Sequence, residues 1–298
     1  MNLEKGTIEN MSASKILGIK DCLELQKIAG EIATSAAALI RKQRAELQRT
    51  GKLSFSFTNK TSAVDPVTVV DRAAEEFIVA ELKRLRPQDG LLGEEGSDQR
   101  SQSGITWIID PIDGTVNFLY GIPAYAVSIA ATLGNEILAG AVINVVSQEL
   151  YLAARGHQAT RQKPGEEPIT LKVSGATELG KSLVATGFSY EAPRRQQQAA
   201  LLSQILPRVR DIRRIGSAAL DLCRLAEGSV DLYYEHGLHP WDFAAGTLIA
   251  REAGAKVYTP NLAEPERPWT AVVGYAPSLE SQWQQLQKEI KFPLNLES

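Results

Sequence analysis

Apolar positions near the start of the chain recur at helical spacing. Between residues 21 and 49, apolar side chains repeat every three or four positions, which predicts a long amphipathic helix. The same spacing from about Asp71 to Arg84, with Phe77 and Leu82 on the apolar face, predicts a second helix. Residues 1–20 begin with polar side chains of both charges. We therefore expect a loosely held N-terminal tail that is not a secretory signal.

The middle of the chain changes from helical spacing to strand patterns. Runs of β-branched and aliphatic residues predict strands over residues 105–109, 125–133, 137–146 and 150–154. The breaks at Gly134-Asn135 and Ser147-Gln148 are typical of hairpin turns. Antiparallel strands that follow one another in sequence argue against a simple doubly wound parallel sheet. Residues 157–168 are polar and contain glycine and proline, which indicates a surface loop.

The second half of the chain alternates between the two patterns. They predict strands over 182–186, 230–234 and 271–275, and helices over 193–206, 217–227, 241–253 and 278–290. Ser217 suits the N-cap of its helix, and Gly228 suits the stop. We expect an α/β (α+β) protein with a first and a second sheet. The polar stretch near 156–180 is the best internal boundary. It would divide a single domain, residues 21–298, into subregions of about 21–160 and 180–298.

Composition and charge narrow the function classes. The chain has 298 residues, of which 44% are hydrophobic and 22% are charged, as in an ordinary globular protein. A net charge of −3 gives no general reason to expect a nucleic acid or an anionic membrane as partner. Cys22 and Cys223 are far apart, so no disulfide framework is implied, and no apolar stretch is long enough to span a bilayer. We expect a cytoplasmic protein.

The predicted strand at 105–109 runs directly into an acidic turn. Asp110 and Asp113 follow it, with Pro111 between them. A carboxylate at the end of a buried strand is costly unless its desolvation is compensated, and a metal cation is the usual partner. Proline stiffens the turn, so both carboxylates and the Ile112 carbonyl can face one point. Oxygen ligands of this kind suit Mg²⁺. The alternative is a plain Asp-Pro-x-Asp-Gly turn.

The residues after this turn suit a phosphate group. Gly114 lets the backbone approach a ligand closely, and Thr115 could open a helix whose free N–H groups bind an anion. A chain with a slightly negative net charge needs a local metal or a local lysine to hold an anionic substrate. Together with the acids, these residues predict a magnesium and phosphate site.

Acids and a lysine outside this segment are candidates for the same site. Glu94 follows Leu91-Leu92 and is either a solvated turn residue or a third carboxylate beside Asp110, which would complete a binuclear site. Asp71 either stabilises the start of its helix or accepts a hydrogen bond from a threonine hydroxyl. Lys60 is either a surface lysine or a loop contact for phosphate or a third metal.

Asp242 lies near the start of the predicted helix at 241–253. It either offsets the helix dipole or uses the same position to face a cleft as a ligand of a second metal. His236 and His239 precede it, and one interpretation is that they are zinc ligands. No cysteine lies nearby and carboxylates dominate, so a hard cation is the better interpretation.

These pieces occur together in one known family. From about Leu25 to Tyr275 the chain resembles the inositol monophosphatase family of magnesium-dependent, lithium-sensitive phosphatases. Several motifs in the same order and with correct internal spacing make the resemblance very specific. The motifs are Lys60 with Val67-Thr-Val-Val-Asp71, Gly93-Glu94-Glu95, Trp107-Ile-Ile-Asp110-Pro-Ile-Asp113-Gly-Thr115-Val-Asn117-Phe118, Arg214-Ile-Gly216-Ser217-Ala218-Ala219, and residues 235–254.

The resemblance implies a role for each site residue. Glu94, Asp110 and the Ile112 carbonyl would hold a first Mg²⁺. Asp110, Asp113 and Asp242 would hold a second, and Glu94 would help to hold a third, weaker ion. Thr115, hydrogen-bonded to Asp71, would orient the nucleophilic water, and the amides of Gly114 and Thr115 would cradle phosphate. Glu235 would bind a substrate hydroxyl. The polyol pocket would also be lined by Gly216, Ser217 and Ala218, with Asp242 close to the substrate.

The resemblance also implies a fold and a reaction. The fold would be a layered α/β/α/β/α sandwich with mixed or antiparallel sheets, commonly a homodimer. The reaction would be hydrolysis of a phosphate monoester by metal-activated water, with two or three Mg²⁺ per subunit and inositol 1-phosphate as substrate. Fructose 1,6-bisphosphate, adenosine 3′,5′-bisphosphate and histidinol phosphate are alternatives. The segments 113–118 and 235–242 favour inositol phosphate, and the Lys-Glu-Phe found after Gly-Thr in nucleotidase relatives is absent.

A different class of function stays open as a second role. A family member could work in an RNA or transcription complex, because a fold does not fix function. The proposed ligand residues are all present, however, and the weak negative charge offers no obvious nucleic-acid face. We therefore expect catalysis on a small phosphate ester and no nucleic-acid partner.

Overall fold

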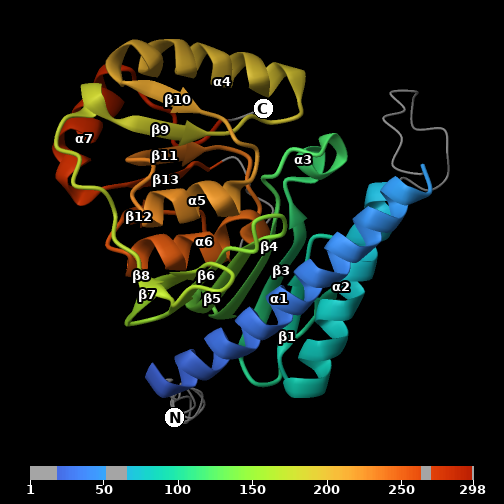
Figure 1. Cartoon of the computed structure of the whole chain (residues 1–298). Helices are drawn as coiled ribbons and strands as arrows, with labels where there is room; N and C mark the ends of the chain where they lie inside the picture. Colours follow the sequence, from blue (N-terminus) through green and yellow to red (C-terminus); the bar gives the residue numbers. More distant parts are fainter. Residues whose placement is uncertain (1–18, 52–65, 263–269, 297–298) are drawn as a thin grey trace, which may run out of the picture.

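The computed structural model describes residues 19–51, 66–262 and 270–296. The expectations for the N-terminal tail and for Lys60 lie outside the described residues. Figure 1 shows a layered molecule in which helices cover the sheets on both faces. Among the described helices, none combines the length and the apolarity that crossing a membrane requires.

The first sheet has eight strands and follows the hairpin pattern of the sequence. Its order is β2 (Asp98–Gln99), β1 (Gly90–Gly93), β3 (Ile105–Asp113), β4 (Ala126–Leu133), β5 (Glu136–Asn144), β6 (Leu150–Ala154), β7 (His157–Gln162) and β8 (Ile169–Thr170). The strands β1 and β3 pair in parallel, whereas the other neighbours are antiparallel. The predicted strands of this region are confirmed.

The prediction of a surface loop over 157–168 was wrong for its first part. Residues His157–Gln162 form β7, which pairs with β6 and β8. Ala159 is the only fully buried side chain of this strand, so apolar alternation gave no signal. Its pairing comes from backbone hydrogen bonds next to the sheet edge, which polar side chains tolerate.

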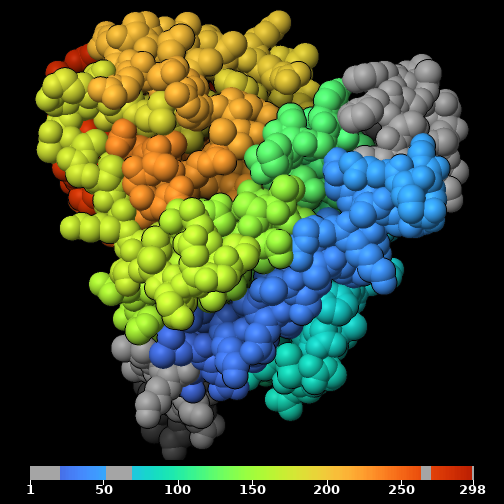
Figure 2. All heavy atoms as spheres, in the orientation of Figure 1, coloured from blue at the N-terminus to red at the C-terminus, as the bar shows by residue number. Residues whose placement is uncertain are grey.

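Two long helices cover the outer face of the first sheet. They are α1 (Ile19–Arg49) and α2 (Pro66–Leu85), and both predicted helices are confirmed. Ile40 and Ile78 pack against Trp107 and Ile129 in one buried cluster. Figure 2 shows α1 in blue lying across the molecule beside α2. The start of α2 is earlier than predicted, because proline is well tolerated in the first helical turn. Asp71 therefore lies inside the helix and is not its cap.

The second sheet lies beyond a middle layer of helices. That layer consists of α5 (Ala218–Ala226) and α6 (Pro240–Glu252). The sheet has five strands in the order β10 (Asp211–Arg213), β9 (Leu183–Thr186), β11 (Leu232–Glu235), β13 (Val272–Tyr275) and β12 (Lys256–Tyr258), with parallel and antiparallel pairs. Leu222 of α5 and Phe243 of α6 belong to a buried cluster that reaches both sheets.

The outer layer on the second sheet is made by α4 (Ala192–Ile205) and α7 (Glu280–Glu289). Leu201 and Trp283 from these helices share a third cluster with Tyr234 of the sheet. Short 3₁₀ turns lie at Leu179–Lys181, Leu206–Arg208 and Pro277–Leu279. The order of layers is thus helices, sheet, helices, sheet, helices, and the α/β/α/β/α expectation with mixed sheets is confirmed.

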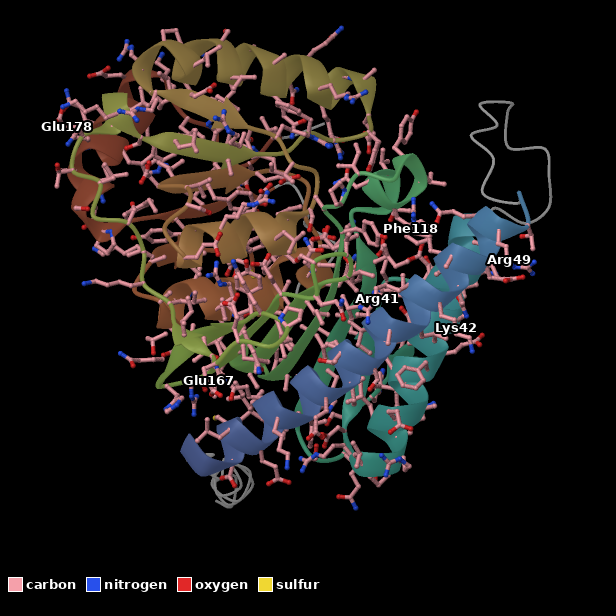
Figure 3. All side chains as sticks on the ribbon, viewed as in Figure 1. Arg41, Lys42, Arg49, Phe118, Glu167 and Glu178 are labelled. Carbon is pink, nitrogen blue, oxygen red and sulfur yellow. The ribbon has the colours of Figure 1, made fainter. Side chains whose placement is uncertain are left out.

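The short helix α3 (Thr115–Tyr120) stands at the end of β3 and is anchored to α1. Arg44 of α1 donates a hydrogen bond from Nε to the Phe118 carbonyl oxygen at 3.3 Å, and its guanidinium lies 5.4 Å from the centre of the Phe118 ring. Figure 3 shows Phe118 between α3 and α1. This anchor fixes the helix that begins directly after the acidic turn.

Candidate active site

The end of β3 carries the acidic turn, and a bulge brings its carboxylates together. In a regular strand, side chains three positions apart point to opposite faces. Asp110 pairs with Ser128 and Asp113 with Ala126, so the register shifts between the two aspartates. Such an extra residue re-aims the side chains that follow it. Asp110 and Asp113 are 1% and 8% exposed and face the same site.

Gly114 turns the chain from β3 into α3. Its φ of 99° lies in the left-handed region, and a Cβ there would lie 2.9 Å from the Ala124 carbonyl oxygen. Glycine is therefore required at this position by both conformation and space. The helix begins at Thr115, as the sequence predicts. The Thr115 hydroxyl donates to the Ile112 carbonyl oxygen at 3.2 Å.

Glu94 reaches the site from the neighbouring strand. The parallel register pairs Gly93 with Ile109, and the Glu94 amide continues it by donating to the Ile109 carbonyl oxygen at 3.2 Å. The next position on β3 is Asp110, whose side chain is a hydrogen-bond partner of Glu94. The expectation that Glu94 lies beside Asp110 is confirmed.

Asp242 completes the group from the middle helical layer. It lies in the first turn of α6, where its carboxylate accepts a hydrogen bond from the His239 amide at 2.6 Å. One carboxylate oxygen each from Asp110, Asp113 and Asp242 lies within 4.8 Å of the others. The turn after β1, the end of β3 and the start of α6 thus bring four acids to one place.

Burial and mutual repulsion oppose ionisation of these acids. Burial is the main cause that raises the pKa of Glu94 to about 7 and that of Asp113 to about 6. Desolvation raises the pKa of Asp110 well above its usual range, and repulsion from Glu94 and Asp113 adds to it. Asp242 is raised well above its usual pKa by the same two causes, burial first. Asp71 of α2, which is 4% exposed, contributes a further negative charge near Asp110.

The donor set fits a divalent cation. The Oδ1 atom of Asp110 is buried and accepts no hydrogen bond from the part of the chain that the structure describes. Asp113, in contrast, is held by the start of α5, because the Ser217 hydroxyl and the Ala219 amide donate to its Oδ2 at 2.6 and 2.7 Å. Clustered carboxylate oxygens without a protein donor are the ligands that Mg²⁺ prefers. Ser217 is also the N-cap of α5, as predicted.

The two histidines near Asp242 have other partners. His236 is buried, and its Nε2 is 2.8 Å from the Pro293 carbonyl oxygen. The His239 ring stacks on Trp241 with the ring centres 4.8 Å apart. Within the described residues, the group that could hold a metal contains aspartates and no histidine. The geometry therefore favours a hard cation over zinc.

The acids open into a cavity of about 400 Å³. Most of the residues expected at the site line it, from the acidic turn and from the start of α5. Ser217 is fully buried behind the wall and contacts Asp113 instead. The predicted residues that line the cavity are Glu94, Asp110, Ile112, Asp113, Gly114, Thr115, Gly216, Ala218, Glu235 and Asp242.

Glu235 faces the cavity from the end of β11. Its Oε2 accepts a hydrogen bond from the Tyr233 hydroxyl at 2.9 Å, and Tyr233 is fully buried. Burial raises the pKa of Glu235 to about 7, while the nearby Arg214 opposes this shift. A side chain at Gly187 would overlap the Glu235 carboxylate, so the glycine makes room for it.

Sequence reasoning gave no role to one wall of the cavity. Arg214 is the only lysine or arginine among the described residues that line the cavity. The other wall residues follow β9, namely Phe188, Ser189, Tyr190 and Glu191. Arg214 lies in one of the motifs on which the family resemblance rests, and this position could have indicated that it belongs to the site. The segment after β9 belongs to none of the motifs identified in the sequence, so nothing in it pointed to the site.

Comparisons with known proteins agree with this geometry. The model of the inositol monophosphatase family matches residues 21–291. The inositol-1-monophosphatase of Mycobacterium bovis is 48% identical over 241 residues, which are 78% of this chain and 83% of that protein. The protein named Nus factor SuhB of Haemophilus influenzae is 40% identical over 195 residues, 65% of this chain and 71% of that protein.

A solved structure supports the same assignment. Mycobacterium tuberculosis SuhB superimposes with a TM-score of 0.76 at 43% sequence identity, over 90% of this chain and 97% of that one. The chain belongs to the inositol monophosphatase family and is a phosphatase.

Proposed function

We propose that this phosphatase hydrolyses small phosphate monoesters with Mg²⁺, and that inositol 1-phosphate is its substrate. The observation that carries the proposal is the acid group at the cavity, in which Asp110 is buried and keeps a carboxylate oxygen without a partner among the described residues. Such an arrangement is unfavourable for the protein alone and favourable with a divalent cation. The relatives named inositol-1-monophosphatase support the substrate.

Each acid has a proposed place around the metal. Glu94, Asp110 and the Ile112 carbonyl would hold a first Mg²⁺, and Asp110, Asp113 and Asp242 a second, with Glu94 near a third. Bound Mg²⁺ supplies Lewis acidity, which lowers the pKa of a water ligand and stabilises negative charge on phosphate oxygens. The hydrogen bonds from Ser217 and Ala219 orient Asp113, so its other oxygen is presented to the metal site.

The chain's own residues would position the ester and the attacking water. The Gly114 and Thr115 amides stand at the start of α3 and would bind the phosphate group. The Thr115 hydroxyl would orient the water. It donates to the Ile112 carbonyl oxygen in this structure, so it would turn to Asp71, the acceptor that the family resemblance implies, when the site is loaded. Glu235, at the end of β11, would bind a hydroxyl of the polyol. Hydrolysis of phosphate monoesters is very slow without a catalyst, so charge stabilisation and in-line positioning are the main demands.

Release of inorganic phosphate from a substrate panel tests the proposal. We expect turnover of inositol 1-phosphate with Mg²⁺ and none in excess chelator. Fructose 1,6-bisphosphate, adenosine 3′,5′-bisphosphate and histidinol phosphate should give a lower kcat/KM. Full activity in chelator would contradict the proposal that the reaction needs Mg²⁺. A higher kcat/KM on one of the alternative substrates would make that ester the substrate instead of inositol 1-phosphate, without contradicting the metal site.

The effect of Mg²⁺ on thermal stability should depend on pH. The ordinary pKa values are 3.8 for Asp113 and 4.5 for Glu94 and Glu235. In the folded protein they are raised to about 6 for Asp113 and about 7 for the two glutamates. For a raised pKa, the stabilising contribution is fully present below the ordinary value and is lost as the pH rises through the folded value. The chelated protein should therefore lose stability from about pH 4 to 7.

Mg²⁺ binds the ionised carboxylates, so it should raise Tm more at pH 8 than at pH 5. Thermal melts at both pH values, with and without chelator, give the comparison. Mg²⁺-free buffer with added Na⁺ at the same ionic strength controls for general screening. An equal Mg²⁺ effect at both pH values would contradict the assignment of these acids as the binding site.

Lithium should inhibit the enzyme. We expect the Mg²⁺-activated rate to fall at millimolar lithium, because a small, hard cation competes for carboxylate oxygens. Sodium at the same concentration is the control. The expectation follows from the family resemblance, and a rate that is constant well above this range would reject it.

The assembly and a second role are further proposals. A homodimer in the cytoplasm is expected from the family resemblance, and sedimentation analysis of the purified protein measures the subunit number. The relatives named Nus factor SuhB motivate a second role in a transcription complex. An RNA-binding measurement with the Asp110→Asn protein would separate such a role from catalysis.

A further inference from the structure

We propose that Glu75 of α2 is a positioning residue for Glu94, and that it sets the affinity of the site for Mg²⁺. The inference rests on the proposed function, because it assigns Glu94 to the metal. Glu75 lies one helical turn after Asp71, so one face of α2 presents both acids toward the site. Neither the sequence patterns nor the family resemblance singled it out.

Glu75 holds the turn that carries Glu94. Its side chain is 3% exposed. Its Oε2 accepts a hydrogen bond from the Glu95 amide at 2.9 Å, and its Oε1 accepts one from the Ser97 amide at 3.0 Å. Both oxygens of one buried carboxylate thus bind backbone donors directly after Glu94. Hydrogen bonds from donors to an ionised carboxylate are among the stronger ones in proteins.

Gly93 is shaped to receive this carboxylate. A Cβ at Gly93 would lie 2.6 Å from the carboxyl carbon of Glu75 and 2.6 and 2.7 Å from its oxygens. Real Cβ atoms do not approach other atoms so closely, so Glu75 can take this position only because residue 93 is a glycine. The Glu75 carboxylate thus packs against Gly93, which precedes Glu94, and accepts a hydrogen bond from the amide of Glu95, which follows it.

The opposite side of Glu94 is fixed by the sheet. Its amide donates to the Ile109 carbonyl oxygen, and the Gly93 amide donates to the Ser97 carbonyl oxygen at 2.7 Å, which closes the turn. Another contact between the turn and α2 is the ion pair of Arg72 with Glu95, at 3.5 Å. The Arg72 side chain is 67% exposed, so this pair contributes little. Glu75 therefore provides a buried anchor between α2 and the turn.

This arrangement adds a negative charge beside the metal-site acids. Glu75 is one of the charges that disfavour ionisation of Glu94. A neutral acceptor could close the turn without that repulsion. The charge of Glu75 is favourable only where a bound cation offsets its repulsion with Glu94. Residues that hold metal ligands in place commonly change metal affinity by about 10- to 100-fold.

The test compares Glu75→Gln with Glu76→Gln. Glu76 is the next residue on α2 and is exposed, so its variant is a matched control. In Glu75→Gln an amide NH₂ replaces one accepting oxygen and faces a backbone donor. Calorimetric titration of the chelator-treated proteins with Mg²⁺ should show Kd raised by about 10-fold in Glu75→Gln and unchanged in Glu76→Gln. The phosphatase rate of Glu75→Gln should recover toward the wild-type value as Mg²⁺ is raised, with little change in KM for the ester.

Gly93→Ala provides a second variant, because its methyl group pushes the Glu75 carboxylate away. It should raise the Mg²⁺ Kd similarly, and the double variant should show little further loss. An unchanged Kd in a folded Glu75→Gln protein overturns the inference, and so does unfolding of both single variants in chelator, which would mean that the turn serves the fold. Wild-type protein that binds no Mg²⁺ would instead overturn the proposed function.

Discussion

Replacement of Asp110 by asparagine should abolish phosphate release and, at the same time, stabilise the metal-free protein. Asp110 is expected to contact both principal metal ions, so the loss of its charge should lower kcat/KM by on the order of 1000-fold or more. The fold has no need of this charge, since Asp110 is 1% exposed and its Oδ1 has no hydrogen-bond partner in the described chain. An amide of the same shape removes the repulsion from Glu94, Asp113 and Asp242.

The gain in stability should be about 1–3 kcal/mol at pH 8 in chelator, the scale of an unsatisfied buried polar group. It should shrink at pH 5, where the acids of the site are more protonated. Asp98→Asn is the matched control, because Asp98 is exposed on the same sheet and should change neither activity nor Tm. A destabilised Asp110→Asn protein in chelator would mean that the carboxylate has a structural role. Near-normal turnover would remove Asp110 from the metal site.

The acidic turn could be predicted from sequence because its chemistry is consecutive. Asp110, Asp113, Gly114 and Thr115 lie within one short segment, and the strand before it is marked by a run of apolar residues. The bulge that turns both aspartates to one side is not visible in the pattern, although Pro111 predicted a stiff turn there. Glu94 was found for a similar reason, since its neighbours Leu91-Leu92 indicate a strand end.

The parts that escaped prediction depend on packing between distant segments. The strands β10 and β12 have three residues each, which is too short for alternation to mark a strand in the sequence. The relation of Glu75 to Gly93 exists only because α2 lies beside β1. Likewise, the sequence does not reveal that Ser217 contacts Asp113 from behind the cavity wall, because the two residues come from different layers. Family resemblance supplied the layered architecture, which periodicity alone left open.

Glu235 and Gly187 are far apart in sequence, but together they shape part of the cavity wall. Glu235 is held by the Tyr233 hydroxyl, and its carboxylate occupies the space that a side chain at Gly187 would fill. If Glu235 binds a polyol hydroxyl, its position decides which ester is used more than whether hydrolysis occurs. Glu235→Gln should then lower kcat/KM for inositol 1-phosphate by about 1–3 kcal/mol, the cost of a lost charged hydrogen bond.

Gly187→Ala should reproduce this loss without touching the carboxyl group. The new methyl group displaces Glu235, so kcat/KM for inositol 1-phosphate should fall on the order of 10- to 100-fold. An aryl phosphate without that hydroxyl should be affected much less. Gly175→Ala is the control, because a Cβ at Gly175 meets no atom within 4 Å. The double variant Gly187→Ala/Glu235→Gln should be little worse than either single one, since both act through one contact. Equal losses on the two substrates would place Glu235 in support of the metal site or the fold rather than in substrate selection.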